Sequence, residues 1–536
     1  MRLPRRWTTV VAALLAIAAG LYAFDASPVG VYYDDAHYVL LGKALADGQG
    51  YRYLNLPGAP EATHYPPAYP LLLAALWRVA PVFPANVVLF KLANVALLGL
   101  AALGTLRLAR RRLGLAEGAS LAVVAASVAT VPMLFLSTML LSEPLFIALL
   151  LPVLLWAEEH ADAVEREPTG ESDGHALRWA LALGAAAGAL TLVRTHAIAL
   201  PPAIAIALWH RGRRREALAV IGASLLTMAP WFAWVARHDA AFSGPLRGNY
   251  GSYMTWLVDG VREHGWALLA GTARRNVQKI LSDSALYLQM GRGSVLHDVA
   301  VLALIVGLVA GARALARRAP VTLGFLALYM SLVVIWPFWP MRFVFGVWPL
   351  VVIVLAAGIQ DAWQTRDTFR LRHLHRLTTL TAGVLLVVGM CWSHARAYPQ
   401  RWWGSLARAN ARPLLGELAW VLPHTRPGDI VGTVNQPAVF LYTGRLAVPI
   451  VSFTPEEYVA PRETAGSVES MRALMRTYPP NVLIATTPDS WRAAAALAAA
   501  PQAELLPIDT LPRIGVAYRH APAAVARSRA ALREAR

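Results

Sequence analysis

The chain has 536 residues, of which 57% are apolar and only 15% are charged, and its formal net charge is +17. This composition is too apolar for an ordinary soluble protein. The positive charge does not indicate nucleic-acid binding, because most arginines lie in short clusters between apolar runs, as expected of cytoplasmic loops. The single cysteine, Cys391, excludes an intrachain disulfide and a thiolate metal site.

The apolar runs indicate repeated membrane crossings, each of which needs about 20 apolar residues. We expect an α-helical polytopic membrane protein with about 11 transmembrane helices and a small extracytoplasmic α/β domain at the C-terminus. The first run follows three arginines, as in a cleaved secretory signal, but it is long enough to be an uncleaved anchor, which we favour. The expected spans are Thr8–Phe24, Asn86–Leu106, Leu121–Leu136, Leu145–Trp156, Trp179–Val193, Ala197–Trp209, Ala217–Val235, Val299–Ala312, Val321–Phe338, Phe343–Ile359 and Leu377–Trp392.

Eleven crossings that start in the cytoplasm place four arginine-rich connections on the cytoplasmic side, as the positive-inside rule requires. The short proline-bracketed run Pro70–Ala80 is predicted to lie along the outer interface without crossing. Residues 1–393 then form the transmembrane module, with outside loops over 25–84 and 236–298, and residues 394–536 form the outside domain. The cytoplasmic arginines are Arg107, Arg110, Arg111, Arg112, Arg211, Arg213, Arg214, Arg215, Arg313, Arg317, Arg318, Arg366, Arg370, Arg372 and Arg376.

The outside domain has the pattern of a small α/β fold. Short β-rich runs alternate with helical patterns, which predicts strands and helices packed together. None of these helices opens with a glycine-rich phosphate loop, which argues against a nucleotide site. The expected strands are Asp429–Val434, Leu446–Val451 and Asn481–Thr486, and the expected helices are Val468–Thr477 and Ser490–Ala499.

Two adjacent carboxylates, Asp34 and Asp35, come directly after the first span. Carboxylates at a membrane face are costly unless they are exposed, bound to a metal or functional. A close pair also raises the pKa of one member, which suits a general base that works near neutral pH. The alternative, which the sequence leaves open, is an acidic N-terminus for a helix over Ala36–Ala46.

Two further clusters lie on the same predicted side of the membrane. His64 and Tyr65 stand before two prolines near the end of the first loop, where His64 is either a ligand, a base or a plain interface residue. Glu143 follows Ser142 at the outer end of the third span. Ser142 can cap the next helix and leave the Glu143 carboxylate available.

Arg194 and Arg342 interrupt apolar stretches at the predicted outer ends of spans. A guanidinium group suits bidentate recognition of phosphate, although an arginine at this depth can also extend to lipid headgroups. The topology deduced from the cytoplasmic arginines brings both residues to the same face as Asp34, Asp35 and Glu143. Carboxylates with guanidinium groups suit proton abstraction from a hydroxyl and stabilisation of a phosphate leaving group.

These motifs resemble the C-type (GT-C) glycosyltransferases, in particular the polytopic family that includes protein O-mannosyltransferases and lipid A aminoarabinose transferases. The resemblance covers most of the chain. Family members often have Asp-Glu where this chain has Asp34-Asp35, and the aminoarabinose branch tends to have Glu-Lys where this chain has His64-Tyr65. The matching pieces are Asp34-Asp35 with Tyr38, Gly42, Gly48 and Gly50-Tyr51, His64-Tyr65-Pro66-Pro67, Ser142-Glu143-Pro144, Gly188–Arg194, Pro230-Trp231, Arg342-Phe343 with Pro349, and Tyr442-Thr443-Gly444-Arg445.

The resemblance implies an inverting glycosyltransferase that moves a sugar from a polyprenyl-phosphate donor to an acceptor hydroxyl or phosphate group at the extracytoplasmic membrane face. It implies that Asp34 is the general base and that Asp35 supports it or binds a cation. Arg342 and Arg194 would hold the phosphate of the donor. The location implied is the bacterial inner membrane, with a cytoplasmic N-terminus and a periplasmic C-terminal domain.

The resemblance also implies that Glu143, His64 and Tyr65 position the acceptor or a metal ion. A divalent metal ion is the only cofactor implied, and the sequence identifies neither its presence nor its ligands. The expected partners are the lipid-linked sugar donor, a lipid, glycan or protein acceptor, and membrane lipids. Nucleic acid is not expected.

Two other classes of function are compatible with a polytopic chain. A transporter or flippase would show internal repeats and ionisable residues near the midplane of the membrane. Here the ionisable residues lie mostly at outer span ends, and a large outside domain follows. An assembly protein that works through its tail would tolerate the loss of the Asp34 carboxylate.

Overall fold

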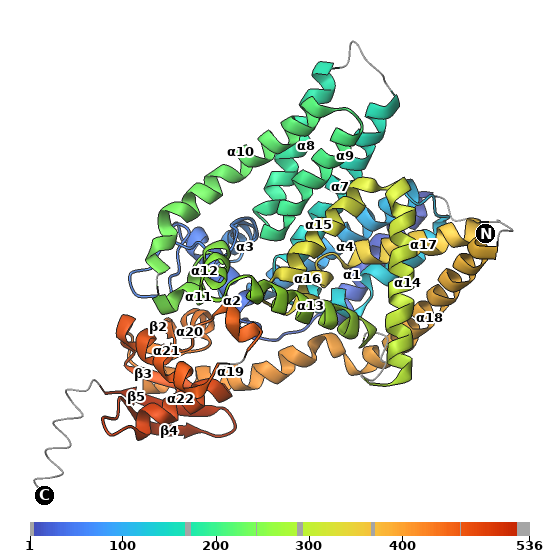
Figure 1. Cartoon of the computed structure of the whole chain (residues 1–536). Coiled ribbons are helices and arrows are strands. Elements are labelled where there is room, and N and C mark those ends of the chain that lie inside the picture. Colours follow the sequence, from blue (N-terminus) through green and yellow to red (C-terminus); the bar gives the residue numbers. More distant parts are fainter. Residues whose placement is uncertain are drawn as a thin grey trace, which may run out of the picture. The chain divides into compact units, whose positions relative to one another are not determined.

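The computed structural model describes residues 5–166, 173–242, 244–286, 293–365, 370–460 and 462–521 (Figure 1). These residues fall into two compact units. The first unit is built from Met1–Asp25, Lys91–Phe232 and Leu269–Gly404, and the second from Ala26–Phe90, Ala233–Leu268 and Ser405–Arg536. Arg366, one of the expected cytoplasmic arginines, lies outside the described residues.

All secondary-structure elements in the described part of the first unit are helices, and the 3₁₀ helices are labelled η. Its elements are α1 (Arg5–Ala23), α4 (Val87–Arg111), α5 (Glu117–Val128), α6 (Val131–Thr138), α7 (Glu143–Arg166), α8 (Asp173–Thr191), η1 (Thr195–Ala199), α9 (Leu200–His210), α10 (Arg214–His238), α13 (Trp266–Leu286), α14 (Val295–Arg318), α15 (Pro320–Ile335), α16 (Pro340–Phe345), α17 (Trp348–Gln364), α18 (Arg370–Gln400) and η4 (Trp402–Gly404).

Among the described helices, α1, α4, α7, α10, α14 and α18 are long and apolar enough to cross a membrane, and the bent pair α5–α6 adds a seventh candidate. The prediction of a polytopic α-helical membrane protein is therefore confirmed. The other four expected spans coincide with α8, α9, α15 and α17, of which α9 and α15 have only 11 and 16 residues. The count of eleven crossings stays a prediction.

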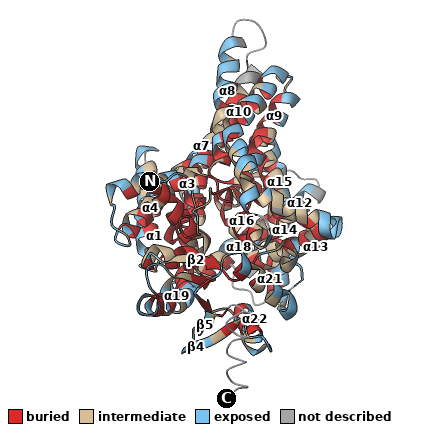
Figure 2. Ribbon diagram, turned by 90° about the vertical axis from the view of Figure 1, so that its left-hand side faces the viewer, coloured by how far each residue is buried: buried red, intermediate tan, exposed pale blue. Residues whose placement is uncertain are grey.

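Several of these helices expose apolar side chains in a way that suits lipid and not water. The most apolar stretch of α10 is only 17% buried, whereas that of α4 is 61% buried. On α10, Leu218 and Leu226 are 64% and 76% exposed. Figure 2, coloured by burial, shows buried residues near α4 and exposed residues on the group of helices that includes α10. Large exposed apolar surfaces of this kind mark contact with a partner or a membrane.

Close helix contacts in this unit use small residues, as is usual where lipid provides no hydrophobic driving force. A Cβ atom on Gly311 of α14 would lie 2.0 Å from the carbonyl oxygen of Val354 on α17. A Cβ atom on Gly358 of α17 would in turn lie 2.8 Å from the backbone nitrogen of Gly311. The two glycines therefore let these backbones approach more closely than any larger residue would.

The break between α5 and α6 bends the expected third span by 55°. Backbone groups freed inside a membrane need other partners. The Tyr398 hydroxyl donates to the Ala129 carbonyl (2.7 Å), and the Val131 amide donates to Nε2 of His394 (3.2 Å). Polar side chains of α18 thus stabilise the bend, after which the chain leads into α7.

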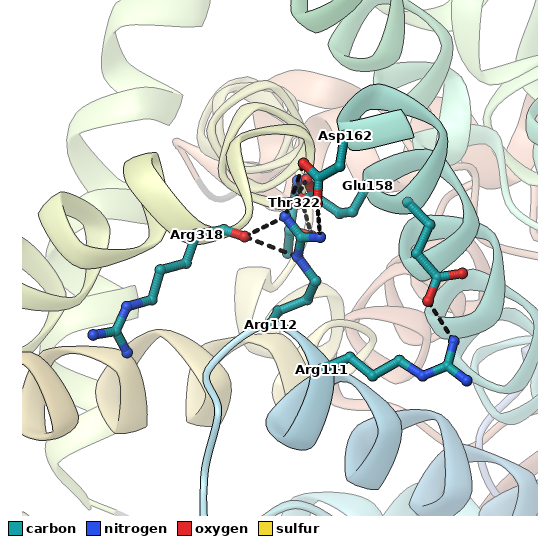
Figure 3. Close-up of polar contacts among 7 residues, drawn as sticks. Arg111, Arg112, Glu158, Asp162, Arg318 and Thr322 are labelled. Atoms are coloured by element: carbon teal, nitrogen blue, oxygen red, sulfur yellow. Dashed lines mark hydrogen bonds and ion pairs between the residues drawn. The ribbon is translucent and has the colours of Figure 1, made fainter. Parts of the chain in front are cut away.

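A polar network joins the ends of α4, α7, α14 and α15 (Figure 3). The Arg112 guanidinium pairs with Asp162, and its Nε donates to the Arg318 carbonyl (2.8 Å). The buried Glu158 carboxylate accepts hydrogen bonds from the backbone amide and the hydroxyl of Thr322, both at 2.8 Å. Arg112, expected as a cytoplasmic topology signal, therefore also connects the end of α4 with α7 and α14.

The second unit combines the first loop, part of the central loop and the tail. Its elements are α2 (Asp34–Ala46), α3 (Ala68–Val79), η2 (Asp239–Phe242), η3 (Gly244–Leu246), α11 (Arg247–Tyr250), α12 (Tyr253–His264), α19 (Ser405–His424), β1 (Ile430–Thr433), α20 (Gln436–Thr443), β2 (Leu446–Pro449), η5 (Pro455–Tyr458), α21 (Thr464–Thr477), β3 (Val482–Ala485), α22 (Pro488–Ala499), β4 (Leu505–Leu511) and β5 (Gly515–His520).

The tail forms one five-stranded sheet in the order β2-β1-β3-β5-β4. The first three strands are parallel, whereas β5 runs antiparallel to both β3 and β4. Side chains of α21 and α22, such as Met471 and Leu497, form a buried core with Leu483, Leu505 and Tyr518 of the sheet. The expected α/β domain is confirmed, and its three expected strands and two expected helices correspond to β1, β2, β3, α21 and α22.

The sequence did not predict α19, α20, β4 or β5. The strand β4 contains Pro507 and lies at the edge of the sheet, with its middle residues exposed. It therefore lacks the regular alternation of a half-buried strand, and proline is tolerated at an edge position. The expected domain boundary at residue 393 stays a prediction, and α18 continues beyond it to Gln400.

Candidate functional site

Asp34 opens α2 directly after a strained residue. Tyr33 has φ +65°, a conformation that bulky residues rarely adopt. The Asp34 side chain is half-buried, and its Oδ1 accepts a hydrogen bond from the Tyr65 hydroxyl at 2.7 Å. The two residues lie 31 positions apart, yet the structure holds the carboxylate in one orientation through this contact.

The neighbouring carboxylate of Asp35 is buried and turned back into its own loop. It accepts backbone amide hydrogen bonds from Gly30 (2.9 Å), Ala36 (3.0 Å) and Tyr32 (3.2 Å). Burial raises the pKa of Asp35 to about 6, and the three amides lower it only in part. Asp35 therefore closes the turn that precedes α2, so its oxygens are already engaged.

His37 is a third residue of this cluster, and the sequence did not single it out. Its ring lies against the rings of Tyr33, Tyr65 and Tyr250, with centroids 4.5 to 5.5 Å apart. Its Nδ1 lies 3.2 Å from the Tyr33 carbonyl oxygen. Burial lowers the pKa of His37 to about 4, so the ring is neutral at physiological pH. The one available signal was its position three residues after Asp34 in the same helix.

His64 joins the first loop to the central loop. Its Nδ1 lies 2.5 Å from the Gly251 carbonyl oxygen, and its ring packs on Tyr253 with a centroid distance of 3.8 Å. Burial lowers the pKa of His64. These contacts connect loop segments within the second unit, and they occupy the ring face and one ring nitrogen.

The first unit contains a buried cluster of Glu143, Arg194 and Arg342, which we call the Arg–Glu–Arg cluster. One oxygen of Glu143, Oε1, lies 3.0 Å from Nη1 of Arg194 and 2.6 Å from Nε of Arg342. The three side chains are 0%, 7% and 25% exposed, respectively.

Three different elements supply the Arg–Glu–Arg cluster. Glu143 is the first residue of α7, Arg194 precedes η1, and Arg342 lies in α16. The Arg194 guanidinium also lies over the Phe343 ring, 4.9 Å from its centroid. Both guanidinium groups thus converge on one carboxylate oxygen in a largely buried site. Guanidinium groups in such a site are suited to bind the oxygens of an anion such as phosphate.

The structure groups the residues expected from the sequence into two sets. Glu143, Arg194 and Arg342 contact one another in the first unit. Asp34, Asp35, His64 and Tyr65 lie in the second unit, where Asp34 contacts Tyr65. The sequence expected Glu143 to position an acceptor or metal ion, whereas its observed contacts are with the two arginines.

Comparison with known proteins shows the fold of this chain. No protein-family model and no curated protein sequence matches it. It is similar to ArnT from Cupriavidus metallidurans in the apo state, with a TM-score of 0.52, 15% identity and coverage of 96% of this chain and 98% of that chain. The same protein bound to undecaprenyl phosphate gives a TM-score of 0.50 at 14% identity, with coverage of 95% and 97%.

An archaeal enzyme has the same architecture. The oligosaccharyltransferase AglB from Archaeoglobus fulgidus, in complex with an inhibitory peptide and a dolichol-phosphate, matches with a TM-score of 0.51, 11% identity and coverage of 92% of this chain and 71% of that chain. ArnT and AglB are both GT-C glycosyltransferases. The chain therefore has the GT-C fold, as the resemblance in sequence implies.

One structure of an Archaeoglobus fulgidus oligosaccharyltransferase is a complex with zinc and sulfate, so the expected metal ligands of this chain were compared with the needs of a metal site. The described residues contain no group of three or more His, Cys, Asp or Glu side chains that could hold a metal ion. Asp35 is taken up by backbone amides, and one nitrogen of His64 by a carbonyl. The side chains that were expected to bind a metal ion are therefore not arranged as a metal site among the described residues.

Proposed function

We propose that this chain, which has the fold of the GT-C enzymes, is a membrane glycosyltransferase. It moves a sugar from a polyprenyl-phosphate donor to a hydroxyl or phosphate group of an acceptor. The transfer takes place at the extracytoplasmic face of the bacterial inner membrane, with the N-terminus in the cytoplasm and the C-terminal domain in the periplasm. ArnT binds undecaprenyl phosphate and AglB binds a dolichol-phosphate, which supports a lipid-phosphate donor here.

The observation that carries this proposal is the convergence of two guanidinium groups in the Arg–Glu–Arg cluster. A sugar joined to a polyprenyl phosphate is a phosphodiester with one negative charge, which guanidinium groups recognise. When the sugar leaves, the phosphate gains a second negative charge. Guanidinium groups held in a buried site stabilise charge that develops in this way. Glu143 would then keep the two guanidinium groups aligned before the donor arrives.

The donor must also remain in the membrane. Withdrawing a prenyl tail from the bilayer costs about 0.8 kcal/mol per CH₂ group. The Arg–Glu–Arg cluster belongs to the unit that contains the apolar spanning helices, so a phosphate bound there can keep its tail in lipid. This location supports a lipid-linked donor over a soluble nucleotide sugar.

Asp34 is proposed as the general base. The acceptor oxygen attacks the anomeric carbon while its proton passes to the Asp34 carboxylate. The bond between the anomeric carbon and the phosphate oxygen breaks, and its electron pair stays on the polyprenyl phosphate. Attack opposite the leaving phosphate inverts the anomeric centre. Tyr65 orients the carboxylate through its hydroxyl, and Asp35 holds the preceding turn.

The proposed reaction can be tested directly with purified full-length protein. We expect transfer from at least one member of a panel of polyprenyl-phosphate sugars, and none from the corresponding nucleotide sugars. The reaction releases the lipid part of the donor as polyprenyl phosphate, which mass spectrometry detects whatever the acceptor is. Transfer from nucleotide sugars alone, or release of polyprenyl diphosphate, would contradict the proposed donor class.

The proposed sidedness has its own test. Cys391 is the only cysteine, so Cys391→Ser provides a cysteine-free background. Gln49 in the first loop and Ala116 between α4 and α5 are both exposed. We expect an impermeant maleimide to label Gln49→Cys in intact cells, and Ala116→Cys only after permeabilisation. The reverse labelling pattern would place Asp34 in the cytoplasm and would contradict transfer at the extracytoplasmic face.

A further inference from the structure

The loop that leads to Asp34 is held by the C-terminal domain. Within the second unit, the Val29 amide donates a hydrogen bond to the Tyr442 hydroxyl of α20 at 2.9 Å. The Val31 carbonyl accepts one from Nδ2 of Asn410 on α19 at 2.8 Å. The residues on either side of Gly30 thus depend on side chains that follow them by 413 and 379 positions.

Gly30 itself fits closely against the same helix α20. A Cβ atom at this position would lie 2.5 Å from Cβ of Ala438 and 3.2 Å from Cδ2 of Leu414 on α19. Its φ of +105° is also a conformation that favours glycine. The Gly30 amide then donates to Asp35, which connects the contact with the tail to the start of α2.

This support explains how Tyr33 keeps its strained conformation. A non-glycine residue with positive φ is strained, and it persists only where the surroundings determine its conformation. Tyr33 lies between the turn closed by Asp35 and the carboxylate of Asp34. The contacts of Val29, Gly30 and Val31 with the tail fix the entry into that turn.

Further hydrogen bonds connect the tail with the first loop and with the central loop, so the tail is held at several points within the second unit. Asn55 of the first loop exchanges hydrogen bonds with Ala447 of β2, at 2.8 and 3.1 Å. Asn249 of the central loop donates to the Val451 carbonyl and accepts from the Phe453 amide, both at 3.2 Å. Contacts at several points allow the tail to hold the turn before Asp34 in place.

We propose that the C-terminal domain positions the general base of this enzyme, with Tyr442, Asn410 and Ala438 as positioning residues that act on Asp34 through the 26–33 loop. The tail is then a part of the catalytic apparatus and not an independent acceptor-binding module. This inference rests on the proposed role of Asp34. It also gives Tyr442, the first residue of the Tyr442–Arg445 motif, the role of holding the loop before Asp34 through its hydroxyl group.

The first test replaces Tyr442 with phenylalanine, which removes only the hydroxyl group. We expect hydrogen exchange of the peptide over residues 26–36 to become about three- to tenfold faster, because a buried hydrogen bond of ordinary strength is lost. With the polyprenyl-phosphate sugar that the panel identifies, kcat should fall by about tenfold or more while the KM for this donor stays unchanged, since misplaced catalytic groups slow the chemical step. The matched control is Tyr518→Phe, a buried tyrosine of β5 in the same tail.

The second test acts through size and includes a rescue. Gly30→Ala should slow transfer and speed exchange over residues 26–36, because the added methyl group meets Ala438. Adding Ala438→Gly removes the Cβ atom that lies nearest to the added methyl group. It should partly restore both the rate of transfer and the slow exchange over residues 26–36. Thermal unfolding of each protein in detergent separates this effect from a loss of stability, because transfer is compared at a temperature at which every variant is folded.

The outcomes separate this inference from the proposed function. Unchanged exchange over residues 26–36 in Tyr442→Phe would overturn the positioning role, whatever the activity. Faster exchange with unchanged kcat would overturn it as well, because the loop would then be held without consequence for the base. Retained transfer in Asp34→Asn would instead refute the base itself.

Discussion

Replacing Asp34 with asparagine is expected to lower kcat for transfer by about a hundredfold to ten-thousandfold, the usual contribution of a general base. The amide keeps the size of the side chain and can still accept a hydrogen bond from Tyr65, but it cannot take the proton of the acceptor. Equilibrium binding of the lipid donor should be unchanged, because the proposed phosphate ligands are Arg194 and Arg342. Initial rates of polyprenyl phosphate release and a donor binding isotherm measure the two quantities.

Two other variants make this prediction specific. Asp489→Asn removes an exposed carboxylate from α22 in the same unit and should leave the rate unchanged. Tyr65→Phe removes only the hydroxyl that orients Asp34, so its loss of rate should be smaller than that of Asp34→Asn. Full activity in Asp34→Asn would contradict the assignment, and it is the result that an assembly protein predicts.

Replacing Arg342 with alanine is expected to weaken donor binding by about tenfold to a hundredfold. A hydrogen bond to a charged group contributes about 1.5–3 kcal/mol, and each 1.4 kcal/mol is about a factor of ten in affinity. Arg342 is the more exposed of the two arginines, at 25%, and is thus the more accessible to a ligand. The measurement is the Kd for polyprenyl phosphate, with the KM for the acceptor as the comparison.

The choice of Arg342 also limits the damage to the fold. Without it, Glu143 and Arg194 remain as a neutral pair 3.0 Å apart. Glu143→Ala would instead remove the carboxylate that both guanidinium groups contact, and loss of one partner of a buried ion pair typically destabilises by about 3–5 kcal/mol. The control is Arg317→Ala, which removes an exposed arginine paired with Asp361 on the same unit. A larger effect on the acceptor than on the donor would remove the phosphate role of Arg342.

The sequence alone determined the class of the protein and most of its local structure. Runs such as Asn86–Leu106 and Val299–Ala312 predict helices because a lipid-exposed backbone must satisfy its hydrogen bonds internally. The parallel strands β1, β2 and β3 were also predictable, since each is a short apolar run bounded by turn residues. The residue types at Asp34, Arg194 and Arg342 indicated acid–base and phosphate chemistry.

Only the tertiary structure decided how these side chains are paired. Glu143 looked available as a ligand, but Oε1 holds Arg194 and Arg342, which follow it by 51 and 199 positions. Asp35 looked like a partner in catalysis, but it closes a turn whose position depends on Tyr442. Periodicity and turn chemistry are local properties of the chain, whereas these contacts join residues that are close only after the helices have packed. The pairing within the Arg–Glu–Arg cluster and the support of Asp34 therefore could not be derived from sequence patterns.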